Sequence, residues 1–278
     1  MNSDQSLSRA KGLFDSHAHY YDPRFANEYP GGADAILTAF RNGGIEGVIN
    51  IGTNLKTSEV CLDMAGRYDF MHASVGIHPE DCHGIHMPVD DAIRTIEDMA
   101  VHNRDKVVAI GEIGLDYYRD SYEGVPLNKT LEKEYFDKQL TLSEKLSLPA
   151  VVHDRDAHGD CMDMILSHPK SFGVFHSFSG SLEMARELIK RGWYISFTGV
   201  ITFKNAVKFA GIIPAIPEDR LLVETDCPYL APHPFRGMIN HSALMAETVK
   251  KMAELRGTSY EHMAQVTCEN AKRLFKIP

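Results

Sequence analysis

Histidines and carboxylates stand at the ends of several short apolar runs in this sequence. The first run ends in Asp15-Ser16-His17-Ala18-His19. On a strand, residues two apart point to the same side, so the imidazoles of His17 and His19 can share one cation. A pair with this spacing is common in proteins without any metal. Its position at the end of a predicted strand gives it weight here.

Other donors occupy the same place in later runs. Glu112 lies in Ala109–Asp116, among apolar and glycine residues, where a buried carboxylate costs free energy unless it is paired or binds a metal. Each such residue alone is better explained as a core histidine or a capped carboxylate than as a metal ligand. Their recurrence at the ends of successive runs favours a divalent-metal site. The donors are His17, His19, Glu112, His153, His176 and Asp226.

The types of these donors restrict the metal. Four imidazoles and two carboxylates without a thiolate suit Zn, Mg, Mn, Ni or Co, and do not suit a cysteine-rich structural zinc. Six donors are too many for one tetrahedral catalytic zinc that keeps an open position. We therefore expect two divalent metal ions bridged by a carboxylate, an arrangement used in the hydrolysis of phosphodiesters and amides.

Eight β-rich runs alternate with amphipathic segments and must position these donors. Most of the runs lack strict polar alternation, which is typical of a parallel sheet covered by helices. The pattern predicts an α/β fold of the (β/α)8 TIM-barrel type, with its active site at the C-terminal ends of the strands. The predicted strands are Leu13–His19, Gly47–Thr53, His72–His78, Val107–Leu115, Ala150–His153, Gly173–Ser177, Tyr194–Val200 and Leu221–Asp226. The predicted helices are Ala33–Asn42, Thr57–Tyr68, Asp90–Asn103, a segment with Leu131, Tyr135, Leu142 and Leu146 on one face, Cys161–Ser167, Leu182–Arg191, Ser242–Arg256 and Ser259–Phe275.

Length and charge limit the other possibilities. The chain has 278 residues, and a TIM barrel of roughly 250 residues forms one domain. We predict a polar N-terminal extension over 1–12 and a single hydrolase domain over 13–278. The formal net charge of -9 argues against a protein that coats nucleic acid, which needs a surface rich in Lys and Arg. An enzyme that binds a few phosphates through cations is compatible with this charge.

The sequence also predicts a cytoplasmic location. No stretch approaches the roughly 20 apolar residues of a membrane span, and the polar N-terminus has no apolar core of a signal peptide. The five cysteines are widely scattered and form no CxxC pair, which favours a reduced protein without a disulfide framework. We therefore expect no membrane partner.

Six segments together resemble the TatD family of metal-dependent hydrolases, whose members have an amidohydrolase-like barrel. The resemblance runs in unbroken order from about Leu13 to Phe275. The segments that carry it are Phe14–His19, Val75–Pro79, Gly111–Tyr118, Val151–Ala157, Phe175–Gly180 and Glu224–Leu230. The resemblance implies divalent-metal-dependent deoxyribonuclease activity, with DNA or another phosphodiester as substrate.

The resemblance also implies a role for each donor. His17, His19 and Asp226 would bind the first metal, and His153 and His176 the second. Glu112 would bridge the two metals, where related barrels often use a carboxylated lysine. Asp226 would also act as the general base, so that Asp226 and Glu112 are the expected catalytic residues.

Residues around the donors bear on the substrate. His78, Arg155 and Arg236 are candidates for binding the substrate phosphate, and each is equally well explained as a structural ion-pair or loop residue. The segment Arg236–Ser242 departs from the family pattern by losing two cations and a proline. None of these differences touches an expected metal ligand.

We therefore expect an enzyme, a TatD-type deoxyribonuclease that cleaves phosphodiester bonds through a metal-activated water. The alternative is an amidohydrolase or deacylase that uses the same binuclear site on a C–N or carboxylic ester bond. A minor alternative is a non-catalytic metal-binding scaffold, which loss of a ligand would mark, and all six donors are present.

Overall fold

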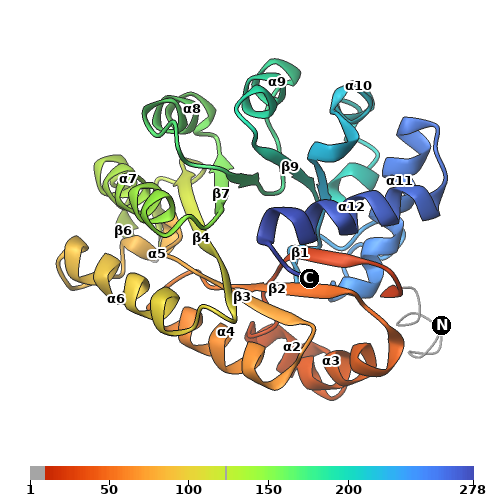
Figure 1. Cartoon of the computed structure of the whole chain (residues 1–278), viewed down its shortest axis with the longest axis horizontal. Coiled ribbons are helices and arrows are strands. Elements are labelled where there is room, and N and C mark those ends of the chain that lie inside the picture. Colours follow the sequence, from red (N-terminus) through yellow and green to blue (C-terminus); the bar gives the residue numbers. More distant parts are fainter. Residues whose placement is uncertain (1–9, 123) are drawn as a thin grey trace.

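Eight parallel strands form the centre of the molecule, and helices surround them (Figure 1). The computed structural model describes residues 10–122 and 124–278. The strands follow one another in the sheet in chain order. They are β1 (Phe14–Ala18), β2 (Gly47–Ile51), β3 (Met71–Val75), β4 (Val107–Asp116), β7 (Ala150–Arg155), β8 (Gly173–Phe175), β9 (Tyr194–Phe197) and β10 (Leu221–Val223).

The sheet closes into a barrel because the first strand meets the segment that follows the last one. Ala18 forms a parallel bridge with Cys227. The amide of Asp226 donates to the carbonyl of His17 at 2.9 Å, and the amide of His19 donates to the carbonyl of Cys227 at 2.9 Å. This closure confirms the predicted (β/α)8 architecture.

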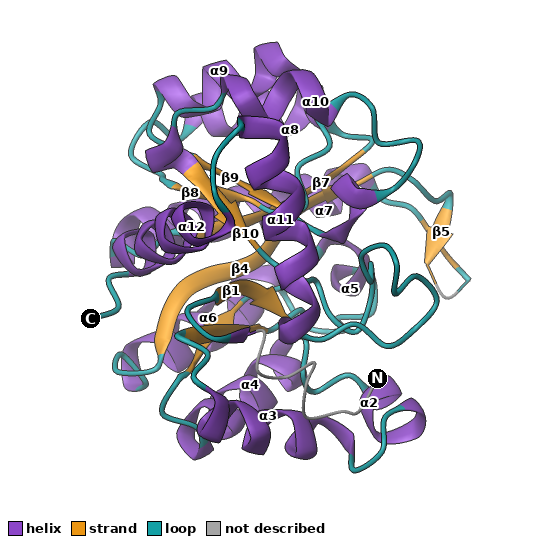
Figure 2. Ribbon diagram, turned by 90° about the vertical axis from the view of Figure 1, so that its right-hand side faces the viewer, coloured by secondary structure: helices purple, strands orange, loops and turns teal. Residues whose placement is uncertain are grey.

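Helices cover the outer face of the strands, as Figure 2 shows. The longer ones correspond to the helices that the apolar periodicity predicts. The helices are α2 (Pro23–Glu28), α3 (Gly32–Gly43), α4 (Leu55–Arg67), α5 (Pro79–Cys82), α6 (Val89–His102), α7 (Lys129–Leu146), α8 (His158–Ser167), α9 (Leu182–Lys190), α10 (Phe209–Ile212), α11 (Met245–Arg256) and α12 (Tyr260–Phe275). A small hairpin of β5 (Ser121–Tyr122) and β6 (Val125–Pro126) stands beside the barrel.

The barrel interior is apolar at one end and polar at the other. Inward-facing residues of successive strands, including Phe14, Ile49 and Val151, form one buried cluster with the last helix. From α12, Leu274 and Phe275 join this cluster and cover the N-terminal end of the strands. The polar donors occupy the opposite, C-terminal end.

Six of the eight predicted strands, all except those that begin at Val107 and Ala150, end earlier than the sequence indicates. β8 ends at Phe175 and β10 ends at Val223, and beyond these ends Ser177 and Asp226 have positive φ angles of 42° and 56° that an extended strand does not adopt. β9 ends at Phe197, and a 3-10 turn over Gly199–Thr202 follows it.

Part of the predicted N-terminal extension and all of the cysteines can be placed. Residues 1–9 of the extension lie outside the described residues. Ala10 is fully buried, and the amide of Gly12 donates to the carbonyl of Gly44 at 3.2 Å.

All five cysteines are buried and free. No helix in the described part of the chain is long and apolar enough to span a bilayer.

Candidate metal centre

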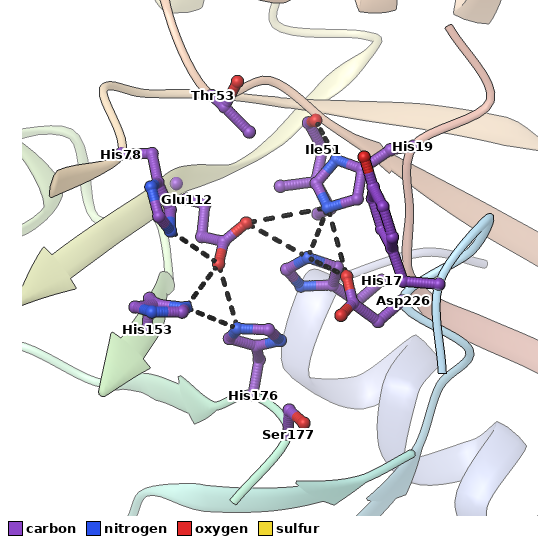
Figure 3. Close-up of polar contacts among 12 residues, drawn as sticks. His17, His19, Ile51, Thr53, His78, Glu112, His153, His176, Ser177 and Asp226 are labelled. Carbon is purple, nitrogen blue, oxygen red and sulfur yellow. Dashed lines mark hydrogen bonds and ion pairs between the residues drawn. The ribbon is translucent and has the colours of Figure 1, made fainter. Parts of the chain in front are cut away.

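The six predicted donors converge at the C-terminal end of the barrel (Figure 3). Each lies on a barrel strand or within three residues of its end. His17 is on β1, Glu112 is on β4 and His153 is on β7. His19, His176 and Asp226 follow β1, β8 and β10.

Glu112 lies between two groups of histidines, and each of its oxygens faces one group. Its Oε2 is 3.2 Å from His17 Nε2 and 3.7 Å from His19 Nε2. Its Oε1 is 3.0 Å from His153 Nδ1 and 2.9 Å from His176 Nε2. A carboxylate whose two oxygens each face a separate group of donors has the geometry of a bridging ligand.

Asp226 completes the group formed by the two histidines of the first strand. Its Oδ1 is 3.3 Å from His19 Nε2 and 3.7 Å from His17 Nε2. The Nε2 atoms of the two histidines are 3.0 Å apart. On the other side of Glu112, His153 Nδ1 and His176 Nε2 are 3.1 Å apart.

These separations fit divalent cations. Ligand atoms about 2.1 Å from a tetrahedral cation lie about 3.4 Å from one another, and the separations within both groups fall between 2.9 and 3.7 Å. The ligand atoms of His17, His19 and Glu112 all lie within 4.8 Å of one another. Clustered imidazoles and carboxylates at such distances indicate divalent-metal binding.

Contacts behind three of the imidazoles, hydrogen bonds for His19 and His153 and an ion pair for His176, leave the other ring nitrogen facing the centre. His19 Nδ1 is 2.9 Å from the carbonyl oxygen of Ile51, to which its N–H donates. His153 Nε2 is 3.1 Å from Asp116 Oδ2, and His176 Nδ1 is 3.3 Å from Glu224 Oε1. In each ring, the other nitrogen faces Glu112 or Asp226, where a metal would take the place of its proton.

Sequence reasoning did not assign a role to either of these supporting carboxylates. Asp116 is four residues after Glu112 on β4, and Glu224 is two residues before Asp226. Both are almost completely buried. The signal available in the sequence was a second carboxylate near a predicted ligand, in a segment that must be buried.

Electrostatics in the centre keeps its carboxylates ionised. Burial alone would raise the pKa of Glu112, but His176, His17 and His78 hold the pKa well below its usual value. For Asp226, burial is likewise outweighed, mainly by His19, and the pKa is lowered.

The same contacts favour protonated histidines while no metal is bound. Burial alone would lower the pKa of His153, but hydrogen bonds to Asp116 and Glu112 raise it to about 9. Burial also opposes the charged form of His176, and Glu112 and Glu224 raise its pKa well above the usual value.

The metal centre lies in a pocket of about 670 Å³. Glu112 and Asp226 line its base, and Arg119 and Arg155 line it on the side of β4 and β7. The acidic residues Asp22, Glu80 and Asp81 line the pocket as well, and a further part of the lining is apolar. It includes Phe178, Phe197, Val200, Ile201, Phe209 and Leu230.

Two of the three candidate substrate contacts lie at this pocket. His78 lines it, and its Nε2 is 3.4 Å from Glu112 Oε1. Because His78 Nδ1 accepts the amide of Glu80 at 3.1 Å, its Nε2 carries a proton and donates. Arg155 also lines the pocket, with its guanidinium 3.8 Å from the centre of the Tyr118 ring.

Arg236 is the candidate that the structure does not bring to the pocket. Its guanidinium carbon lies 4.2 Å from the centre of the Phe203 ring, and it is absent from the described residues that line the pocket. Arg119, by contrast, lines the pocket and was not singled out from the sequence. It follows directly after Tyr117 and Tyr118 at the end of β4.

Comparisons with known proteins agree with this geometry. A family profile described as "TatD related DNase" matches residues 14–276. The metal-dependent hydrolase YabD of Bacillus subtilis is 39% identical over 267 residues, which are 95% of this chain and 99% of that protein. The metal-dependent hydrolase YcfH of Escherichia coli K12 is 34% identical over 268 residues, 95% of this chain and 96% of that protein.

A solved structure matches closely as well. The crystal structure of YjjV, a TatD homologue from Escherichia coli K12, is similar with a TM-score of 0.85 and 28% sequence identity. The match covers 97% of this chain and 100% of that chain.

Proposed function

We propose a function for this chain from one premise: it belongs to the TatD family of metal-dependent hydrolases. The proposed function is that of a deoxyribonuclease that cleaves phosphodiester bonds of DNA. One observation supports this function above all others. The two oxygens of Glu112 face separate groups of histidines at the base of a pocket that Arg119 and Arg155 line, so cationic groups can surround a phosphodiester.

The residues present would hold two divalent cations. His17, His19 and Asp226 would bind the first, and His153 and His176 the second, with Glu112 shared between them. We call these two groups the first and the second subsite. Cations of Zn, Mg, Mn, Ni or Co bound there supply water activation and offset negative charge on the phosphoryl oxygens.

Asp226 is suited to accept the proton of the attacking water. Its side chain is 18% exposed, the most open of the six donors. It lines the pocket, so it can reach a water held there. Its lowered pKa keeps it in the basic form, which a general base needs.

His78 and Arg155 are suited to orient the phosphodiester. The Nε2–H of His78 points toward the base of the pocket, where Glu112 lies. Arg155 offers a planar guanidinium that is held against Tyr118, and such a group binds phosphate oxygens through two parallel hydrogen bonds. We add Arg119 to this set because it lines the same side of the pocket.

A parallel assay tests the proposal. The full chain, purified without chelator and analysed for its metals, is loaded with each candidate cation. It is then assayed on bis-(p-nitrophenyl) phosphate, on DNA and on a panel of acyl esters and amides. We expect metal-stimulated cleavage of the two phosphodiesters, and its loss in Glu112→Gln. Turnover of acyl substrates alone would replace this proposal with the amidohydrolase alternative.

A further inference from the structure

We propose that Asp116 and Glu224 are positioning residues of the second subsite, which they serve by holding its two histidines. This proposal rests on the two-cation centre proposed above. Neither carboxylate is one of the six donors. Both are buried, Asp116 at 1% and Glu224 at 0% exposure, and each faces the nitrogen of a histidine that points away from Glu112.

Asp116 is fixed at both of its oxygens. Its Oδ2 is 3.1 Å from His153 Nε2, and its Oδ1 accepts the amide of Tyr118 at 2.9 Å. Its own amide donates to Glu132 Oε2 at 3.1 Å. A carboxylate held in this way requires the proton of His153 on Nε2, which leaves the lone pair of Nδ1 directed toward Glu112 Oε1 at 3.0 Å.

Glu224 contacts the other histidine of the second subsite, His176. Its Oε1 accepts the amide of Ser177 at 2.6 Å and is 3.3 Å from His176 Nδ1. Its Oε2 accepts the hydroxyl of Ser16 at 3.5 Å. Glu224 therefore holds Nδ1 of His176 by an ion-pair contact and not by an aligned hydrogen bond, and Nε2 of the ring faces Glu112 Oε1 at 2.9 Å.

The first subsite is built differently. His19 donates to a backbone carbonyl, that of Ile51. His17 Nδ1 is buried and, like His176 Nδ1, has no hydrogen-bond partner among the described residues, and a ring nitrogen of His17 lies within 4.8 Å of Glu224 and of His176. The negative charge of this subsite comes from Asp226 directly. The second subsite has no carboxylate of its own beyond the shared Glu112.

Charge balance explains the difference. Two divalent cations bring four positive charges, and four carboxylates match them, Glu112 and Asp226 in direct contact and Asp116 and Glu224 behind imidazoles. A carboxylate that accepts the imidazole proton raises the basicity of the ring toward a metal. We infer that the second cation depends on Asp116 and Glu224 more strongly than the first cation does.

Stepwise metal binding tests this inference. The metal-free full chain is titrated with Co²⁺, followed by its visible absorption, and with Zn²⁺ in a calorimeter. In Asp116→Asn and Glu224→Gln we expect the second equivalent to bind about 10–100-fold more weakly, and the affinity for the first equivalent to change much less. The Co²⁺ spectrum of the second equivalent should also change.

Asp160→Asn is the matched control. Asp160 accepts the hydroxyl of Tyr117 at 2.8 Å and pairs with Lys133 at 2.8 Å, beside the same end of β4. It hydrogen-bonds to neither His153 nor His176. This variant should bind both equivalents as the wild type does.

The outcomes separate the two proposals. Unchanged affinity for the second equivalent in both variants, or equal weakening of both equivalents, would overturn the positioning roles. A wild-type chain that binds only one equivalent would overturn the two-cation centre itself. If Glu224→Gln does not fold, as judged by circular dichroism, Asp116→Asn decides the matter.

Discussion

At the scale of single residues, Glu112 is the residue whose carboxylate contacts both groups of histidines in the candidate metal centre. Four imidazole nitrogens lie within 3.4 Å of its carboxylate, those of His17, His78, His153 and His176. No neutral side chain of the same size can balance such a group of cations and imidazoles. The activity of the enzyme should therefore depend on this charge more than on any other single charge.

We predict that Glu112→Gln lowers kcat/KM for bis-(p-nitrophenyl) phosphate by roughly 10³-fold, because one preorganised charged group is worth on the order of 10²–10³ in rate. Asp226→Asn should have a similar effect, since it removes both a ligand and the proposed base. Steady-state kinetics with saturating metal checks this, with circular dichroism to verify folding. Turnover near that of the wild type in either variant would contradict the assignment.

Metal affinity should rise with pH. The pKa of His153 in the metal-free chain is raised to about 9, so below that pH a proton occupies the ring and a cation must displace it. Each displaced proton weakens binding by up to about tenfold per pH unit as the pH falls. Zn²⁺ titrations between pH 6.5 and 8.5, in two buffers of different ionisation enthalpy, would measure the affinity and the protons released.

A histidine outside the centre provides the control for the pH experiment. His158 pairs with Asp154 at 2.8 Å and contacts none of the six donors. His158→Ala should preserve both the pH dependence and the proton release. An affinity that is equal at both ends of the pH range in the wild type would refute the prediction.

Arg155→Ala should raise KM for DNA by about 5–10-fold and leave kcat nearly unchanged, because the loss of a positioning contact to phosphate costs about 1 kcal/mol. Arg236→Ala is the matched control, since Arg236 packs on Phe203 away from the pocket. Steady-state assays at low salt check both variants. A larger effect in the control than in Arg155→Ala would show that the DNA follows another path.

Residue types and spacing pointed to the six donors, because five of them stand at the end of an apolar run and Glu112 stands inside one, and the family resemblance supplied the role of each. Asp116 and Glu224 were not recognised, because their contribution depends on which nitrogen of an imidazole faces inward. Which nitrogen faces inward depends on the three-dimensional positions of the side chains, and the spacing of residues in the sequence does not indicate it. Arg236 was selected for its charge, and its packing on Phe203 could not be read from the sequence.

At the scale of elements, the close approach of β4 and β7 positions the second subsite. Gly114 pairs with His153 across these strands and has a φ of +136°. A Cβ atom at Gly114 would lie 2.0 Å from the carbonyl oxygen of His153, a contact that only a shift of the backbone relieves.

We predict that Gly114→Ala lowers the free energy of unfolding by roughly 3 kcal/mol, since overpacking a rigid site costs about 1–3 kcal/mol and backbone strain adds to it. It should also weaken the second metal equivalent by displacing His153. Urea denaturation and metal titration check the two effects. Gly159→Ala is the control: it lies in α8 with no atom within 4 Å of the added Cβ, and we expect a gain of about 0.5–1 kcal/mol.

All eight barrel strands were predictable, because each is a short apolar run between polar turns. Their ends were less predictable, since the left-handed residues Ser177 and Asp226 follow two of the strands without a glycine to signal the change. The short helices α2, α5 and α10 contain six residues or fewer. Segments of that length show too little periodicity to be recognised.

At the scale of the whole molecule, a bound cation would connect strands that are far apart in the chain. The donors come from five of the eight barrel strands or from the residues just after them, so metal binding should stabilise the entire barrel. A ligand at 100 times its Kd stabilises by about 2.7 kcal/mol. We therefore expect chelation to lower Tm by about 5–10 °C.

Differential scanning calorimetry with and without EDTA measures this shift. The variant Glu112→Gln should show a much smaller response to added metal than the wild type. A Tm that is the same in metal-loaded and metal-stripped wild-type protein would mean that the cations do not bridge the strands.

The junction between β1 and the segment after β10 has a consequence for protein synthesis. The first subsite takes His17 and His19 from the start of the chain and Asp226 from near its end, and the bridge of Ala18 with Cys227 joins them. A nascent chain still held on the ribosome before residue 226 emerges lacks the Asp226 ligand of this subsite. We therefore expect incomplete translation products to be inert, and the hydrolase to become active only after the barrel has closed.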